Sequence, residues 1–279
     1  ILLVGPLGMG TEGAAYATIT AQGISFVISI FYLKRHHVFF GTTVCKKLTV
    51  QWDKIVAILK IGLPTAIQMV VVNTAYLLVT GMLNQFGTSV SAASGVGLQI
   101  NTFAGMPCWA VGQAVTAMVG QCMGAEQIKR ARKVVKIGLL VNIAMTLVVV
   151  LCVQVFAEQL ILLFGSNSRE VVTDGVYYLR VCCGVNSLIY AAMYTLDSFS
   201  IGVGAANVAM LNALLDAVVV RLPVSWILAF TLGMGFPGIY FGQALSPILP
   251  AFVGFIYFKS GIWERKSLIQ KNRKKGNPE

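Results

Sequence analysis

Three ionisable side chains inside apolar stretches stand out as candidates, because charge there is costly to bury and usually functional. They are Asp197, Asp216 and Arg221. Asn212 precedes Asp216 by four residues and shares its helix face, and Arg221 follows by five, about 7–8 Å along the axis. Asp216 and Arg221 therefore predict either a structural ion pair or a proton- or cation-coupled switch. Asp197, near the end of its stretch, is either a group that water reaches or a transport or proton site.

Neutral amides and aromatic rings mark the same stretches. The amides are Gln68, Asn73, Gln99, Asn101, Gln113 and Gln243. Amides in lipid usually bind neighbouring helices, and the alternative is that they line a cavity for an amphipathic or cationic substrate. Four rings could then stack on a cation: Tyr76, Phe103, Trp109 and Tyr194. Our candidate pathway for substrate or coupling cation combines these amides, except Gln113, with Asp197, Asn212, Asp216 and Arg221.

Motifs of known catalytic sites are missing from the sequence. It contains no HExxH, no GxSxG, no P-loop and no GxGxxG that opens a helix after a strand. The six cysteines lack metal-ligand spacing, and the two histidines are adjacent in a basic loop. We therefore expect a protein that is not an enzyme, with no metal or cofactor. Any transport would be driven by a gradient of Na⁺, of H⁺ or of substrate.

The composition indicates which elements hold these residues. Of 279 residues, 57% are hydrophobic and 11% charged, against about 25% charged in a soluble domain, and mean hydropathy is +0.78. These values exclude disordered, fibrous and ordinary soluble chains and predict an all-α, polytopic transmembrane bundle. A span needs about 20 apolar residues. Residues 1–5 look like the tail of a further span. Seven complete stretches qualify: 11–33, 57–81, 90–118, 136–164, 174–200, 207–231 and 236–258.

The basic residues predict the orientation in the membrane. The net charge is +11, and most of the 21 Lys and Arg residues lie in segments 34–60, 129–136 and 259–275. Even numbers of spans separate these segments, so all three face one side, the cytoplasm by the positive-inside rule. Without aromatic interleaving or a binding motif, they indicate contacts with membrane lipids and no nucleic acid. We expect a multi-pass protein of the plasma membrane with a cytoplasmic C-terminus.

An internal repeat suggests a duplicated architecture. Residues 7–13 (LGMGTEG) and 232–238 (LGMGFPG) agree at five of seven positions. Each copy leads from an uncharged turn through an apolar span into a basic segment. The second copy ends a run of six spans, so the first is expected to end an earlier run of six, most of it outside this chain. Two similar halves with substrate held between them are typical of secondary transporters.

Several motifs, taken in order, resemble the MATE (multidrug and toxic compound extrusion) family of the MOP flippase superfamily. They are Gly10-xx-Gly13-Ala14-Ala15-x-Ala17-Thr18, Ile61-Gly62-Leu63-Pro64-xxx-Gln68, Val119-Gly120-Gln121-xx-Gly124-Ala125 with the basic stretch 129–136, Tyr178-Leu179-Arg180, and Arg221-Leu222-Pro223. The third motif with its basic follow-on is the most specific. The resemblance implies spans six to twelve of twelve.

The resemblance also implies a division of the chain. Residues 1–33 would end the N-lobe, 34–56 form the cytoplasmic inter-lobe loop, 57–258 the six-helix C-lobe and 259–279 a basic cytoplasmic tail. The missing N-lobe would be the main partner. Two segments depart from the family pattern: 199–206 lacks the usual Arg and Asp, and 70–73 lacks the acid that binds a cation in some members.

The resemblance implies Na⁺- or H⁺-coupled antiport of cationic or amphipathic drugs and toxic compounds. A lipid-linked oligosaccharide flippase of the same superfamily is one alternative, although it should place more cations in the cavity than Arg180 and Arg221. A seven-span receptor or photoreceptor is an alternative of another class. It would leave the repeat unexplained, and span 236–258 lacks the Lys of a retinal Schiff base.

Overall fold

The computed structural model describes residues 8–35, 52–163, 168–184 and 186–264. The chain divides into two units, residues 1–53 and 54–279. In the first, the described element is α1 (Gly10–Arg35), which contains predicted span 11–33 and keeps nearly all its described side chains exposed. The tail of a further span at residues 1–5, His36, His37 and Cys45 lie outside the described residues.

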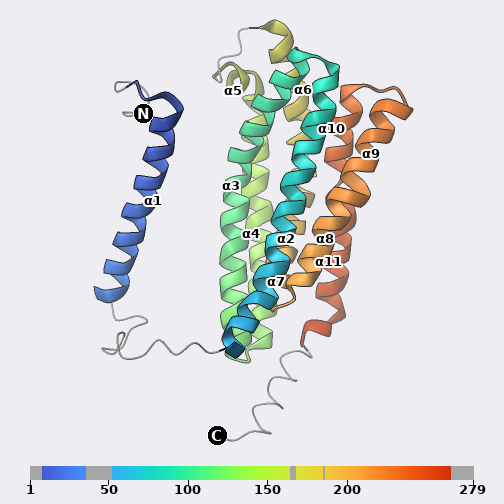
Figure 1. Ribbon diagram of the computed structural model, residues 1–279. Helices are drawn as coiled ribbons and strands as arrows, with labels where there is room; N and C mark the ends of the chain where they lie inside the picture. Colours follow the sequence, from blue (N-terminus) through green and yellow to red (C-terminus); the bar gives the residue numbers. More distant parts are fainter. Residues whose placement is uncertain (1–7, 36–51, 164–167, 185, 265–279) are drawn as a thin grey trace, which may run out of the picture. The chain divides into compact units, whose positions relative to one another are not determined.

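The second unit is built from helices, shown in Figure 1. Their bounds are α2 (Trp52–Leu83), η1 (Asn84–Phe86), α3 (Thr88–Gly124), α4 (Ile128–Val155), α5 (Ala157–Leu163), α6 (Arg169–Cys182), α7 (Asn186–Gly202), α8 (Ala206–Leu214), η2 (Leu215–Arg221), α9 (Leu222–Trp226), η3 (Ile227–Thr231), α10 (Phe236–Leu245) and α11 (Ile248–Ser260). The described residues contain no strand, which confirms the all-α prediction.

The helices overlap the predicted spans but differ from them in bounds: α4 begins at Ile128 rather than 136, and a break at Phe156 divides predicted span 136–164 into α4 and α5. By length and composition, five helical segments of the described residues can cross a membrane, and a sixth does if the bent pair α6–α7 counts as one span. The remaining stretch, 90–118, is helical in α3 but carries many small and polar residues. α3 packs against α4, α6 and α7, so close approach of neighbouring backbones selects small side chains there.

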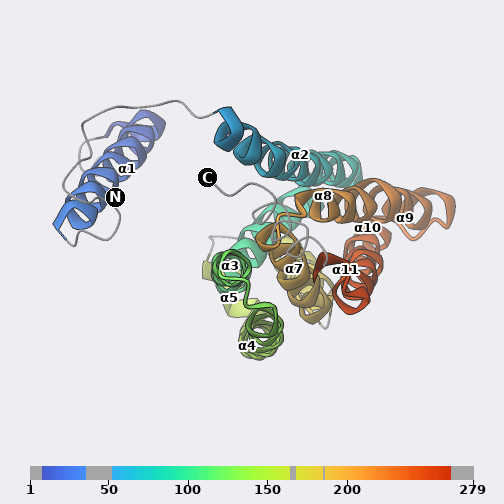
Figure 2. The ribbon, with the colours of Figure 1, turned by 90° about the horizontal axis from the view of Figure 1, so that it is seen from below.

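α7 occupies the centre of the second unit. It packs against α3, α4, α8 and α11, and Figure 2 shows these helices grouped around it. Two glycines of α3 admit tyrosine rings from the neighbouring helices: a Cβ on Gly97 would clash with Tyr178 of α6, and one on Gly112 with Tyr194 of α7. The lack of a side chain at these two glycines therefore fixes the register of α3 against α6 and α7.

Predicted span 174–200 is broken rather than continuous. α6 ends at Cys182, α7 begins at Asn186, and the two axes differ by 51°. A break exposes backbone carbonyls that need partners inside a membrane. Gln154 of α4 meets this need, because its Nε2 donates to the carbonyls of Leu179 (3.2 Å) and Cys183 (3.0 Å).

Predicted span 207–231 is continuous but only partly α-helical. η2 and η3 are π-helical segments on either side of the short helix α9. The pair Gly238-xxx-Gly242 of α10 faces this span at close range. A Cβ on Gly238 would lie 2.7 Å from the nitrogen of Ala229, and one on Gly242 would lie 2.6 Å from Cα of Ser225. The two backbones therefore meet along α9 and η3, at Ser225 and Ala229.

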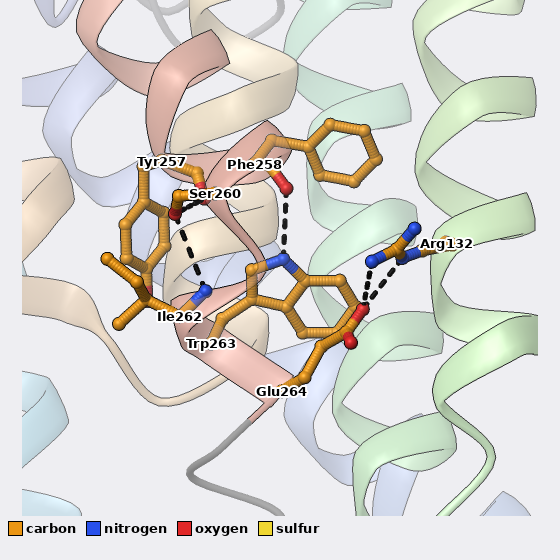
Figure 3. Close-up of polar contacts among 7 residues, drawn as sticks. All are labelled: Arg132, Tyr257, Phe258, Ser260, Ile262, Trp263 and Glu264. Carbon is orange, nitrogen blue, oxygen red and sulfur yellow. Dashed lines mark hydrogen bonds and ion pairs between the residues drawn. The ribbon is translucent and has the colours of Figure 1, made fainter.

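One end of the unit is closed by a clasp between α4 and the turn after α11 (Figure 3). Gly261 adopts the left-handed conformation (φ +67°) that turns the chain back. Trp263 is fully buried, donates its indole N–H to the carbonyl of Phe258 (3.1 Å) and meets Phe199 edge to face. Arg132 of α4 pairs with Glu264, Nε to Oε1 at 2.7 Å. Segment 129–136 and the end of α11 therefore lie at the same end of the unit.

The repeated motif also shares its backbone conformation. Gly8 and Gly10 have φ of +62° and +54°, and the matching Gly233 and Gly235 have φ of +65° and +68°. These left-handed values favour glycine. Each pair lies where a helix begins: Gly10 is the first residue of α1, and Gly235 directly precedes α10. The two copies therefore share a positive φ at both matching glycines as well as their sequence.

Candidate functional site

Asp216 and Arg221 form a buried ion pair inside η2. Both are nearly inaccessible, and Arg221 Nη2 lies 2.6 Å from Asp216 Oδ2. In an α-helix, residues five apart point in different directions, whereas a π-helix bonds residue i to i+5 and brings them together. The sequence left open how the pair could close, because the π segment was not foreseen. In a dry interior such a pair depends on both partners, since losing one leaves an uncompensated charge.

Arg221 also joins two other elements to this pair. Its guanidinium lies over the ring of Tyr76 of α2, 4.6 Å from the centroid, and its Nε donates to Ser246 Oγ between α10 and α11 (3.4 Å). Asp216 Oδ1 and Arg221 Nη1 are buried without a hydrogen-bond partner. The described residues therefore leave one acceptor and one donor of the ion pair unused.

Asp197 binds Asn212 in a second buried contact. Asn212 Nδ2 donates to Asp197 Oδ1 at 2.6 Å, which joins α7 to α8. Asn212 is 1% exposed and Asp197 4%. Asn212 was selected for its spacing of four from Asp216, but its amide binds the carboxylate of another helix. Asn212 Oδ1 has no hydrogen-bond partner.

Aromatic side chains of α3 and α7 form an aromatic group made of Trp109, Tyr190 and Tyr194. The two tyrosine rings stack with centroids 6.2 Å apart, and Trp109 Nε1 donates to the Tyr190 hydroxyl (3.4 Å). Trp109 is 36% exposed. Tyr190 was not among the predicted rings, although its spacing of four from Tyr194 on a helix was a usable signal. Phe103 is exposed on α3 and does not join the group.

The predicted amides do not converge on one point. Asn73 donates to the carbonyl of Met69 in its own helix, and Gln99 is exposed. Asn101 accepts a hydrogen bond from the thiol of Cys183 (3.1 Å), so it serves packing between α3 and the α6–α7 break. Gln68 and Gln243 are half-buried. Their role in a pathway stays a prediction.

Sequence reasoning missed a polar contact among α3, α4 and α7. Asn142 of α4 is fully buried and donates through Nδ2 to Thr195 Oγ1 (2.8 Å), to the carbonyl of Ala191 (3.3 Å) and to Cys108 Sγ (3.4 Å). Asn142 was as visible in its apolar stretch as the amides that we selected. The polar interior of the unit is therefore wider than predicted.

Comparison with known proteins identifies what kind of molecule carries this site. The model of the family described as MatE matches residues 64–227. The probable multidrug resistance protein YpnP of Bacillus subtilis is 28% identical over 269 residues, which cover 96% of this chain and 59% of YpnP. The probable multidrug resistance protein NorM of Thermotoga maritima is 24% identical over 268 residues, which cover 96% of this chain and 57% of NorM.

Solved structures share the fold. The MATE transporter VcmN of Vibrio cholerae in its bent form has a TM-score of 0.80 at 22% identity, covering 96% of this chain and 59% of VcmN. An outward-facing multidrug resistance transporter of the MATE family and MOP superfamily has a TM-score of 0.85 at 19% identity, covering 97% and 59%. This chain therefore spans about three fifths of the length of these proteins.

Proposed function

Because this chain belongs to the MatE family of multidrug transporters, we propose that it forms part of a carrier that exports cationic or amphipathic compounds in exchange for Na⁺ or H⁺. The protein is an integral membrane protein by its family and its apolar helices. The observation that carries the substrate class is the aromatic group of Trp109, Tyr190 and Tyr194, which presents a partly exposed indole beside stacked phenols. Such faces bind planar rings and cations.

The remaining parts of the proposal concern placement. We propose that the rest of the transporter, an N-lobe of similar architecture, supplies the opposite wall of the substrate cavity. Segments 34–56 and 259–279 would be the inter-lobe loop and the tail around the six-helix C-lobe at 57–258. The end that carries the clasp and the basic residues of α4 would face the cytoplasm of the plasma membrane, against anionic lipid headgroups.

The cations of the unit argue against the flippase alternative. Arg221 is buried and neutralised by Asp216, and Arg180 lies on the exposed face of α6. In the part of the chain that the structure describes, neither arginine is therefore a buried, uncompensated cation that could bind a pyrophosphate group.

Trp109→Ala in the full-length protein tests the substrate surface. Efflux of a planar cationic dye is followed from loaded vesicles under a Na⁺ gradient and, separately, a pH gradient. An aromatic contact is worth about 0.5–1.5 kcal/mol, so the half-saturating dye concentration should rise about 2- to 10-fold. Trp226→Ala is the matched control, because Trp226 is 56% exposed on α9 and should leave efflux unchanged. Absence of dye efflux by the unsubstituted protein under both gradients would refute the proposal.

A further inference from the structure

Basic side chains cover one face of the first turns of α4. We call this set the basic stripe: Lys129, Arg132, Lys133 and Lys136. At 3.6 residues per turn, the four side chains point into a sector of about 100°, and all four are exposed. Arg130 belongs to the same segment but points about 110° away from the middle of that sector and donates to Gln127 Oε1 (3.3 Å). The stripe therefore places most of the positive charge of the segment on one line along the helix.

The same face of α4 becomes apolar beyond the basic stripe. Leu140, Leu147 and Leu151 point into the same sector and are 70%, 44% and 56% exposed. Leu147 lies about 16 Å beyond Lys136 along the axis, about the depth of one leaflet of a bilayer. The buried residues of α4 face α3 and α7 instead, and Figure 2 shows α4 at the periphery of the second unit. α4 therefore presents outward first cations and then apolar surface, in the order of a phospholipid headgroup and its acyl chain.

The charge of the stripe is only partly balanced within the protein. Glu264 pairs with Arg132, whose Nε and Nη2 both bind Oε1 of that carboxylate. Among the described residues, Lys133 and Lys136 have no acidic partner. Arg132 Nη1 likewise forms no hydrogen bond with a described residue. The stripe therefore has two lysines and one guanidinium nitrogen available for an external anion.

We propose that the basic stripe and the leucines that continue it form a binding site for one anionic phospholipid, with the phosphate among the cations and an acyl chain along the leucines. The site rests on the proposed placement of this end of the unit at a membrane surface. It goes beyond that placement, because an attraction between basic segments and a leaflet needs no particular face of a helix, whereas a bound lipid does.

The apolar continuation favours a phospholipid over a free phosphate ion. A lysine ammonium is a compact charge that binds phosphate without a fixed geometry, and an arginine adds directed hydrogen bonds. A free ion would gain these contacts alone, which salt weakens at an exposed site. A phospholipid gains them together with apolar contact along Leu140 and Leu147, and the bilayer holds its headgroup at the depth of the stripe.

Arg132 connects this site to the clasp (Figure 3). Its guanidinium binds Glu264 and lies over the ring of Trp263, 5.9 Å from the centroid. A phosphate that accepts a hydrogen bond from Nη1 would hold the guanidinium in this position, because the five N–H donors of arginine serve more than one acceptor. Bound lipid should therefore stabilise the contact between α4 and the turn after α11.

Native mass spectrometry of the full-length protein in detergent tests the site without any transport. Phosphatidylglycerol should bind more tightly than phosphatidylcholine with the same chains. Lys133→Gln and Lys136→Gln should each weaken phosphatidylglycerol binding about 5-fold, and Lys136→Arg should retain it. Arg130→Gln is the matched control, because it removes an equal charge from the same turns on another face, and binding should stay within about 2-fold.

Three outcomes would overturn the lipid site. The first is equal affinity for the two lipids in the unsubstituted protein. The second is an equal loss in Arg130→Gln and Lys136→Gln, which would show a diffuse attraction instead of a site. The third is displacement of phosphatidylglycerol by inorganic phosphate or glycerol 1-phosphate at the same concentration, which would show a site for a free anion.

Hydrogen exchange in nanodiscs tests the connection to the clasp. Amides of 258–264 should exchange more slowly when phosphatidylglycerol is added to phosphatidylcholine, in the unsubstituted protein and in Arg130→Gln. Lys136→Gln should lose most of this protection. Exchange that ignores phosphatidylglycerol in the unsubstituted protein would refute the connection.

These readouts are independent of the proposed transport. If the unsubstituted protein binds phosphatidylglycerol on the stripe but exports no dye, the transport proposal fails and the lipid site stands. If it exports dye but binds both lipids equally, the lipid site fails and the transport proposal stands.

Discussion

Gly112 shows at the residue scale how a missing side chain positions a functional surface. A Cβ at this position would clash with Tyr194 and lie 2.6 Å from Ser198 Oγ. The Tyr194 ring lies against the α3 backbone there and stacks on Tyr190, which holds Trp109 by a hydrogen bond. The aromatic group therefore depends on a residue that itself touches no substrate.

Gly112→Ala should destabilise the protein, by about 1–3 kcal/mol for an overpacked site. The matched control is Gly95→Ala in the same helix, where nothing lies within 4 Å of the added Cβ. Alanine favours the helix by up to about 1 kcal/mol over glycine, so this control should be neutral or stabilising. Thermal unfolding of both variants in detergent checks the contrast. Equal stability of the two would show that Tyr194 moves aside without cost.

The sequence identified the charged residues of the site but not all their contacts. Asp197, Asp216 and Arg221 stand out because charge is rare in apolar stretches. Nothing in the spacing of Asp216 and Arg221 revealed a π segment, and helix periodicity alone could not show that Asn212 binds Asp197 across helices. Contacts between helices depend on tertiary packing, which spacing within one helix does not encode.

At the scale of the elements, polar side chains lie at the places where helices break or widen. The stretch 174–200 has the length and composition of one continuous span, and the structure divides it at residues 183–185. The partner that stabilises the break, Gln154, lies on α4 and is remote in sequence. The apolar stretches therefore predicted which segments are helical, although α4 (Ile128–Val155) begins before and ends before the predicted span 136–164. They could not predict a bend whose stabilising amide comes from another helix.

Gln154→Leu should weaken the junction of α6 and α7. It removes the donor to the Cys183 carbonyl, whereas the Leu179 carbonyl keeps the backbone N–H of Cys183 (2.9 Å). An unsatisfied buried polar group costs about 1–3 kcal/mol. Hydrogen exchange of the amides in 179–190 should accelerate, and the melting temperature should fall. Gln99→Leu is the matched control, because Gln99 is exposed on α3. Unchanged exchange in Gln154→Leu would mean that lipid or water already satisfies these carbonyls.

At the scale of the whole molecule, the distribution of charge agrees with the packing of the second unit. The basic residues of 129–136 and Lys259 were assigned to one side by counting spans. The structure joins the same regions through Arg132, Trp263 and Glu264, at the end of the unit opposite η1 (Figure 1). The turn 82–89 at the other end has no charged residue. The two ends therefore differ in charge, and the assignment of the basic end to the cytoplasm stays a prediction from the positive-inside rule.

This asymmetry predicts which turns face the cytoplasm. Lys129→Cys and Gln85→Cys place thiols on exposed residues at opposite ends of the unit. In intact cells, a membrane-impermeant maleimide should label Gln85→Cys, and it should label Lys129→Cys only after permeabilisation. The unsubstituted protein measures the background from its six native cysteines. Labelling of Lys129→Cys in intact cells would invert the orientation, because the basic end of the unit would then face outward.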